Sequence, residues 1–147
     1  MKSVYPVLDY AAMVSAAKTP VAPNRNPGPE YADSKRVFQG IPGIERAPGG
    51  RLWATWYSGG QGEGPLNYVV LASSADDGEH WSAPGLVIDP PHPVRASDPA
   101  VWVDPLGRLW LFWMQAYTLH DGQWGVWAIV TEEPDQERPA WSAPQRL

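Results

Sequence analysis

Apolar residues come in short runs along this chain, and turn-forming residues separate the runs. In the run 51–57 the even-numbered residues face one side of a strand and the odd-numbered residues face the other, and both sets are largely apolar. A sheet that is apolar on both faces requires other elements packed against both faces. Eight runs have the length and residue content of strands, and they span residues 41–46, 51–57, 67–73, 81–88, 98–103, 108–115, 124–131 and 141–147.

The runs form an internal repeat. The segment 50–56, Gly-Arg-Leu-Trp-Ala-Thr-Trp, recurs as Gly-Arg-Leu-Trp-Leu-Phe-Trp at 107–113, and Trp-Ser-Ala-Pro at 81–84 recurs at 141–144. Each repeat holds four strands, which is typical of a β-propeller blade, and stacked blades would cover both faces of each sheet. The sequence therefore predicts an all-β fold of two four-stranded antiparallel sheets. We expect them to pack face to face through the layers of Trp56 and Trp113.

Composition excludes several other classes. With 17 prolines and 14 glycines in 147 residues, long uninterrupted helices are excluded. Aromatic residues make up 12% of the chain and hydrophobic residues 44%, which argues against disorder. No apolar run approaches the roughly 20 residues that span a bilayer, so we expect a soluble chain with no membrane partner. The net charge of -5 argues against nucleic acid as a partner.

Residue types that commonly bind metals or cofactors are rare in this chain. The chain has no cysteine, which excludes disulfides, thiolate zinc sites and a cysteine nucleophile. His80, His92 and His120 stand alone, without a second ligand at a spacing typical of a metal site. We predict solvated loop histidines, with no metal and no other cofactor. Pro6 and Asp9 interrupt the only apolar stretch near the start, so the sequence shows no clear export signal and indicates no compartment.

One turn carries the most specific motif in the chain. Residues 74–81 read Ser-Ala-Asp-Asp-Gly-Glu-His-Trp, an S-x-D-x-G-x-x-W pattern between the third and fourth runs. The Ser74 hydroxyl and the Asp76 carboxylate can accept backbone N–H bonds, and Gly78 can adopt a positive φ. Trp81 is expected to fill the sheet interior. These residues are predicted to be structural rather than catalytic.

The motif has the form of an Asp-box. Together with the four-strand repeat and the run Phe-Gln-Gly-Ile-Pro-Gly-Ile at 38–44, it makes the sequence resemble the sialidase (neuraminidase) superfamily of Asp-box, or BNR-repeat, β-propellers over about residues 36–147. The resemblance implies an incomplete six-bladed propeller, of which this chain is an N-terminal fragment of about two blades. Residues 1–35 would be a partly irregular extension with a short helix near 8–17, residues 36–97 the first blade, and residues 98–147 the second.

The resemblance also implies a carbohydrate site where the first strands of the blades begin, opposite the Asp-box. The family's acid/base carboxylate lies eleven residues before the serine of the first Asp-box, which is Glu63 in the Gly-rich loop 58–65. Asp98 matches the family's Asp-Pro at the start of the second blade, where the aspartate contacts substrate, and Arg95 lies three residues upstream. From the residues alone, Glu63 can equally be a solvated loop residue, Asp98 a turn cap, and Asp98 with Arg95 a plain salt bridge.

The chain departs from the family pattern at one position. The family places an arginine that grips the substrate carboxylate immediately before the Ile-Pro of the first blade, and here that residue is Gly40. The neighbouring Gln39 can hydrogen-bond a sugar, but it cannot neutralise a carboxylate. The family's further arginines, its tyrosine nucleophile and the glutamate beside that tyrosine come from later blades.

The family resemblance, together with the departure at Gly40, gives three hypotheses for the function. The leading hypothesis is a sialidase-like glycoside hydrolase that removes terminal sugars, with the remaining blades in a longer parent chain and with this chain inactive on its own. The second is a non-catalytic propeller that binds carbohydrate or serves as a scaffold. The third is a lyase or a neutral-sugar glycosidase on the same scaffold, which would account for the missing arginine.

Overall fold

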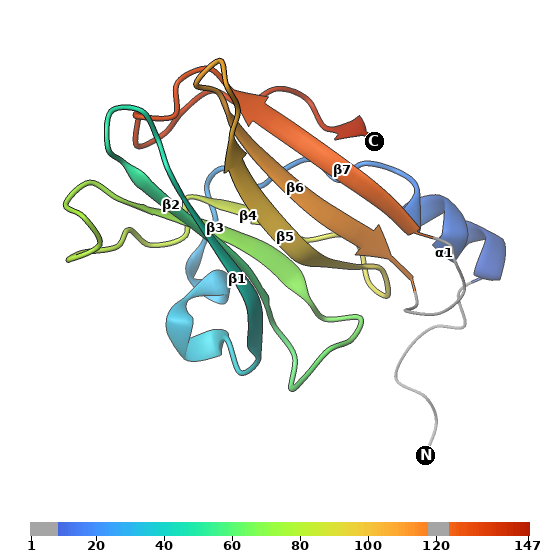
Figure 1. Ribbon diagram of the computed structural model, residues 1–147. Helices are drawn as coiled ribbons and strands as arrows, with labels where there is room; N and C mark the ends of the chain where they lie inside the picture. Colours follow the sequence, from blue (N-terminus) through green and yellow to red (C-terminus); the bar gives the residue numbers. More distant parts are fainter. Residues whose placement is uncertain (1–8, 118–123) are drawn as a thin grey trace.

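The computed structural model describes residues 9–117 and 124–147, and the fold over these residues is mostly β. Two four-stranded antiparallel sheets follow each other along the chain, each with its strands in sequence order (Figure 1). This confirms the predicted all-β fold of propeller blades. The first sheet contains β1 (Gln39–Arg46), β2 (Leu52–Ser58), β3 (Tyr68–Ser74) and β4 (Leu86–Ile88), and the second contains β5 (Arg95–Val103), β6 (Leu109–Ala116), β7 (Trp124–Thr131) and β8 (Gln145–Arg146).

The fourth strand of each sheet is shorter than the sequence pattern predicts. Before β4, Ser82 donates its N–H to the Ser73 carbonyl at 2.8 Å, and its hydroxyl accepts the Ser73 N–H at 3.0 Å. Ser142 makes the same two bonds with Val130 before β8. In each repeat, a serine hydroxyl thus takes the place of one backbone acceptor in the strand pairing. The proline two residues later has no backbone N–H to donate, so regular pairing resumes only after the proline.

The first strand of each sheet carries the same bulge. The register shifts between Gly40 and Gly43 in β1 and between Ser97 and Ala100 in β5. Within these bulges Ile41 has φ 49° and Asp98 has φ 47°, at equivalent positions of the repeat. A left-handed backbone is costly for a residue other than glycine, and most of all for a β-branched one. The two repeats therefore share one backbone conformation in this bulge, although their side chains differ.

The main core lies between the two sheets. From the first sheet it contains Trp53, Tyr57, Val69, Leu71, Leu86 and Ile88, and from the second it contains Leu109, Leu111, Trp113, Trp127, Ile129 and Trp141. The expected Trp113 layer is therefore present, but the expected Trp56 layer is wrong. Trp56 lies on the other face of β2, where it packs with a smaller cluster that includes Tyr31 and Tyr68. Because both faces of β2 are apolar, period-two alternation separates them but does not say which one meets the second sheet.

The two sheets meet through different faces. The first sheet contributes Trp53 and Tyr57, whose repeat equivalents are Trp110 and Met114 on the face of β6 that points away from the first sheet. The second sheet instead contributes the alternate residues of β6, which are equivalent to Leu52, Ala54 and Trp56. The interface is thus head to tail, as between successive blades of a propeller.

The residues before β1 cover the ends and edge of the sheets. Helix α1 (Tyr10–Ala17) begins after Asp9, whose carboxylate accepts the Ala11 N–H, and it contacts β6 and β7 (Figure 1). This confirms the short helix expected near 8–17. Asn24 then forms a bridge to β4, and two short 3-10 turns follow, η1 (Pro29–Tyr31) and η2 (Asp33–Lys35). Within the described ranges, no helix is long and apolar enough to cross a membrane.

The two repeat-related tryptophans before the last strands have different environments. Trp141 is 8% exposed and packs edge-on against Trp53, with ring centroids 6.3 Å apart. Trp81 is 42% exposed, so the expectation that it fills the sheet interior is wrong. Its ring lies beside Gly78 and Leu52 on the outer side of the first sheet. Trp141 is buried because it lies on the side of the second sheet that packs against the first sheet. The described residues place no further sheet over Trp81.

This difference predicts unequal costs of truncation. Trp141→Ala should lower the free energy of unfolding by about 3–5 kcal/mol, because it empties a buried site. Trp81→Ala, its matched control in the other repeat, should cost only about 1–2 kcal/mol because the ring is already partly in water. Chemical denaturation followed by circular dichroism measures both values. Equal costs would contradict the assignment of Trp141 to the inter-sheet core.

Candidate functional site

The predicted site residues lie near one end of the two sheets. Gln39 at the start of β1 pairs with Ser58 at the end of β2, and the loop 59–67 follows Ser58 directly. Arg95 begins β5, and β1 and β5 lie side by side, with the Val103 N–H donating to the Glu45 carboxylate at 3.1 Å. Ser74 lies at the far end of β3, opposite Leu52. The turn 74–81 is therefore at the other end of the strands from the loop that carries Glu63.

Tyr57 is the centre of the candidate site. Its hydroxyl donates to Glu63 Oε1 at 2.5 Å, and its side chain is only 1% exposed. Burial, then the hydrogen bond and charge of Glu63, and then the charge of Asp98 raise the pKa of Tyr57 to about 12, against the opposing charge of Arg95. The phenol therefore stays protonated at neutral pH and acts as a hydrogen-bond donor, and three of the four predicted site residues lie within electrostatic range of it.

Asn67 holds the loop that carries Glu63. It is 1% exposed, and its amide nitrogen donates to the carbonyls of Gly59 at 2.8 Å and Gly62 at 3.0 Å. Its amide oxygen accepts the Gly64 N–H at 2.7 Å. Gly59, at φ 92°, has no room for a Cβ, which would lie 2.4 Å from the Leu66 carbonyl. One buried side chain thus satisfies the backbone on both sides of Glu63 and fixes the loop.

Arg95 joins the second sheet to this loop. Its guanidinium Nη1 donates to Asn67 Oδ1 at 3.3 Å, and the next residue, Ala96, donates its N–H to the Asn67 carbonyl at 3.1 Å. Arg95 is 3% exposed, and its Nε has no hydrogen-bond partner among the residues that the structure describes. A buried cation with an unsatisfied donor is costly in water-excluded surroundings, so this position is one where an additional acceptor would be favourable.

Asp98, like Glu63, is an exposed carboxylate. It follows Arg95 by three residues, and the bulge in β5 sets its backbone at φ 47°. The Ser97 hydroxyl donates to Asp98 Oδ2 at 2.8 Å. The direct bond of Asp98 is thus to Ser97, while the direct bond of Arg95 is to Asn67, so the plain salt bridge left open by the sequence is not formed.

Gln39 belongs to a different hydrogen-bonded group. Its amide oxygen accepts from Trp56 Nε1 at 2.8 Å and from Arg36 Nε at 3.2 Å, on the side of β2 that faces away from the second sheet. The structure also gives a reason for the glycine at position 40. A Cβ there would lie 3.2 Å from the Phe38 ring and 3.4 Å from the Tyr57 ring, so these two aromatic rings occupy the space beside Gly40.

Sequence reasoning missed two residues of this group. Tyr57 ends a strand that reads as apolar on both faces, so its position left open whether it lines the site or covers it. Asn67 has no sequence signal at all, since a single asparagine before a strand is ordinary turn composition. Its role depends on four bonds to residues 59, 62, 64 and 95, and only the folded loop shows them.

The turn 74–80 at the other end of the sheet has the predicted structural chemistry. The Ser74 hydroxyl accepts the Gly78 N–H at 2.9 Å and donates to Asp76 Oδ1 at 2.8 Å, and Gly78 has φ 88°. Asp76 accepts the His80 N–H at 2.9 Å, and its other oxygen lies 2.6 Å from His80 Nδ1. The bonds from His80, first the backbone one, and the bond from Ser74 lower the pKa of Asp76 to about 2.

His80 therefore does not stand alone, contrary to the sequence expectation. Asp76, Glu79 and His80 each place one potential ligand atom within 4.8 Å of the others, but all three are exposed, and bonds within the turn already explain their arrangement. His92 is an exposed loop residue, as expected. His120 lies outside the described residues.

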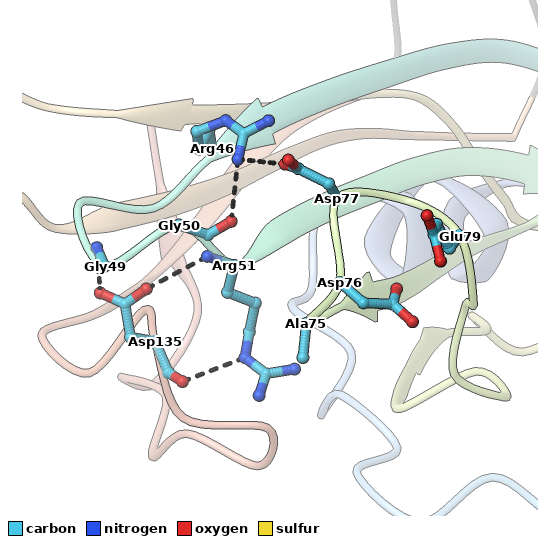
Figure 2. A pocket seen from close by; sticks show the side chains of 9 residues that line it. All are labelled: Arg46, Gly49, Gly50, Arg51, Ala75, Asp76, Asp77, Glu79 and Asp135. Atoms are coloured by element: carbon cyan, nitrogen blue, oxygen red, sulfur yellow. Dashed lines mark hydrogen bonds and ion pairs between the residues drawn. The ribbon is translucent and has the colours of Figure 1, made fainter.

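A polar cleft lies beside this turn, with a volume of about 660 Å³ (Figure 2). Asp135, from the second sheet, accepts the backbone N–H groups of Gly49 at 2.8 Å and Arg51 at 3.4 Å, and Arg51 donates to the Asp135 carbonyl at 3.0 Å. On the open side, Arg46 pairs with Asp77 at 2.7 Å. The lining groups thus bind one another, and Asp135 ties the hairpin of the first sheet to the second.

In the second sheet, the corresponding hairpin is capped by an aspartate of the same sheet. There Asp104 caps its own hairpin, accepting the N–H groups of Leu106 at 2.9 Å and Arg108 at 3.0 Å. The repeat equivalent of Asp104 is Ala47, which has no side-chain acceptor. The first sheet therefore depends on a carboxylate from its neighbour, and the second does not. This makes the cleft a structural junction between the sheets.

The fold is similar to that of a known sialidase. No protein-family model matches the chain, and no curated protein matches it. Among solved structures, it is similar to "Hadza microbial sialidase Hz136", at 18% sequence identity and a TM-score of 0.61. The alignment covers 79% of this chain and 27% of that chain. Identity this low shows the fold alone: the two sheets form a sialidase-like scaffold, and the chain spans about a quarter of the neighbour's length.

The lowered pKa of Asp76 predicts a pH-dependent contribution to stability. Because the folded-state pKa of about 2 lies below the ordinary 3.8, the charged carboxylate stabilises the turn above about pH 4, and this stabilisation is lost as the pH falls toward 2. Asp76→Asn should therefore melt at a lower temperature than the wild type at neutral pH, and the difference should shrink between pH 4 and pH 2. A constant difference in melting temperature would contradict this role.

The bonds of Asn67 predict a local effect on the loop 59–66. Asn67→Ala should lower the free energy of unfolding by about 2–4 kcal/mol, because it leaves several buried partners unsatisfied. It should also accelerate amide hydrogen exchange in the loop. Gln61→Ala, an exposed change in the same loop, is the control and should leave both quantities unchanged. Unaltered exchange in Asn67→Ala would show that the loop does not depend on this side chain.

Proposed function

We propose that this chain is part of a sialidase-like glycoside hydrolase that acts on terminal sugars, with Glu63 as the acid/base residue. The observation that carries the proposal is the contact between Glu63 and the buried Tyr57 hydroxyl, next to Arg95 and Asp98, on a sialidase-like scaffold. A general acid needs an accessible carboxyl at a defined position. Glu63 is exposed, while Tyr57 and the loop bonds of Asn67 restrict where it lies.

In the proposed reaction Glu63 donates a proton to the glycosidic oxygen as the bond to the departing group breaks and the sugar is transferred to the nucleophile of the parent chain. Glu63 then accepts a proton from the water that displaces the nucleophile from the sugar. The bond from Tyr57 engages Oε1, so Oε2 is the oxygen that would meet the substrate. Asp98 is exposed and would accept hydrogen bonds from sugar hydroxyl or amine groups. Arg95, whose Nε lacks a partner within residues 9–117 and 124–147, would supply positive charge beneath them.

Further groups of the reaction would come from further blades. The first and second blades would correspond to residues 36–97 and 98–147, with the Asp-box residues Ser74, Asp76, Gly78 and Trp81 in a structural role. The neighbour is a longer chain, and the nucleophile and additional arginines are assigned in this proposal to a longer parent chain. Carbohydrate is the proposed partner of the site.

One observation favours a neutral sugar over sialic acid, or a binding role without catalysis. The rings of Phe38 and Tyr57 crowd Gly40, where the family pattern has its first carboxylate-binding arginine. Gln39, the neighbouring polar residue, is already bonded to Trp56 and Arg36. A substrate without a carboxylate would not need the missing charge.

Turnover of fluorogenic sugar substrates tests the catalytic proposal. The 147-residue chain alone should not turn over a sialoside. In a parent chain with the further blades, Glu63→Gln should lower turnover by roughly 10²–10⁴-fold, the usual contribution of a positioned proton donor, with little loss of binding. The control Gln61→Ala should retain wild-type turnover. Wild-type turnover by Glu63→Gln would remove Glu63 from the reaction, and activity of the 147-residue chain alone would refute the need for further blades.

Binding to the chain itself separates the sugar classes. Ligand-observed NMR with N-acetylneuraminic acid and with galactose should show binding that Asp98→Asn weakens and that Asp77→Asn, at the other end of the strands, leaves unchanged. Preference for galactose would favour the neutral-sugar alternative. Binding of both sugars unaffected by Asp98→Asn would place the ligand elsewhere.

A further inference from the structure

A second pocket lies on the side of the first sheet that faces away from the second sheet. Tyr68, which begins β3 opposite Ser58, belongs to its lining and to the cluster on that side. The pocket is therefore at the same end of the strands as the Glu63 loop. Its volume of about 360 Å³ is in the range of small-molecule sites. Its lining includes Glu30, Tyr31, Leu66, Tyr68, Asp89 and His92.

The walls of this pocket are held together by contacts within the chain. Tyr31 of the turn η1 packs edge-on against Tyr68, with ring centroids 5.0 Å apart. Its hydroxyl donates to Asp89 Oδ2 at 2.7 Å, which ties η1 to the residue that follows β4. Leu66 comes from the loop before β3. Because η1 already lies over this part of the sheet, no further blade of a longer chain is needed to form the pocket.

The lining is negatively charged. Asp89 and Glu30 belong to it, and no lysine or arginine lines the pocket within the described residues. Burial, then the bond to Asp89, and then the charges of Asp89 and Glu30 raise the pKa of the Tyr31 phenol. The phenol thus lies in the negative potential of both carboxylates.

Asp89 lacks a compensating cation in the lining. Part of the residue is exposed, but burial around its carboxylate raises the pKa of Asp89, and the bond from Tyr31 opposes the rise. Arg36 is paired with Asp33 at 2.9 Å, lies over the Trp56 ring and does not line the pocket. A partly desolvated carboxylate is stabilised by a positive charge beside it. The pocket therefore favours a cationic ligand.

We propose that this pocket binds a small organic cation, an alkylammonium with a compact apolar body. The ammonium group would pair with Asp89 and Glu30, and the hydrocarbon part would contact Leu66 and the tyrosine rings. Tyrosine rings also attract a cation through their electron-rich faces. Leu66 is 52% exposed, so an apolar group on it would be removed from water. Glu63 does not line this pocket, so the pocket is separate from the candidate carbohydrate site.

A neutral sugar is the competing occupant, because aromatic rings and carboxylates also line sugar sites. A sugar stacks on a broad ring face, but Tyr68 is only 8% exposed and Tyr31 packs against it edge-on. A neutral sugar also has no charge to balance Asp89 and Glu30. The charge of the lining thus favours the cation.

Titration of the 147-residue chain with three compounds of similar shape tests the proposal. Cyclohexylammonium is positively charged, cyclohexanol is neutral and cyclohexanecarboxylate is negatively charged. At about pH 8 an ordinary carboxyl group is charged and an ordinary histidine is neutral. In heteronuclear NMR, cyclohexylammonium should shift the backbone signals of Tyr31, Leu66 and Asp89 with a dissociation constant on the order of 1 mM. The other two compounds should bind at least about fivefold more weakly.

Two variants locate the cation. Asp89→Asn removes a charge with little change of shape and should weaken binding of cyclohexylammonium by about fivefold. Glu30→Gln should weaken it in the same direction, and because Glu30 is exposed this variant should keep the fold even if Asp89→Asn does not. Glu132→Gln is the matched control, since it makes the same change in net charge outside the lining and should bind like the wild type.

Several outcomes would overturn the proposal. Equal binding of cyclohexanol would show that apolar shape alone selects the ligand, and unweakened binding in both lining variants would place the cation elsewhere. The absence of a saturable shift, or a galactose titration that shifts the same three signals, would overturn it as well. No step of the test depends on glycosidase activity, so its outcome is independent of the proposed function.

Discussion

The fold depends on burying sheets that are apolar on both faces. A four-stranded sheet with tryptophan on each side of its second strand cannot be stable in water by itself, because the apolar area removed from water is what offsets the loss of chain entropy. Trp53 and Trp113 lie on opposite sides of one core and bury each other's sheets. Residues before β1 cover part of the remaining apolar surface of the first sheet, around Trp56. The packing of the two sheets and of the residues before β1 follows from this need to bury apolar surface.

Polar contacts then fix how the two sheets meet. Asp135 caps the hairpin of the first sheet at one end of the strands, and Asn67 binds Arg95 at the other end. Apolar burial alone is not directional, whereas a buried hydrogen bond is lost when the register slips. The candidate site benefits from this arrangement, since the contact that locks the sheets together also holds the loop of Glu63. Asn67 and Arg95 thus belong both to the junction of the sheets and to the candidate site, whereas the turn around Asp76 lies at the other end of the strands.

The candidate site also shows how a repeat acquires different chemistry in its two copies. Ile41 and Asp98 occupy the same left-handed position in the two bulges, one with an apolar side chain and one with a carboxylate. Asp104 caps its own hairpin, while its counterpart Ala47 requires the neighbour's Asp135. The backbone is duplicated and the side chains are not. The candidate residue Asp98 therefore lies at a position where the two repeats share a backbone conformation but differ in side chain.

The sequence by itself determined the eight strands, the repeat and the turn at 74–80, because these follow from local alternation and turn chemistry, and the family resemblance implied that this turn lies opposite Glu63. It also indicated Glu63, Arg95 and Asp98 through a family resemblance. Only the tertiary structure decided that Trp53 rather than Trp56 meets the second sheet, that Trp81 is exposed, and that Gln39 binds Trp56. It alone showed the roles of Tyr57 and Asn67. Two apolar faces look alike in a sequence, and the partner of a polar side chain depends on residues that are distant along the chain.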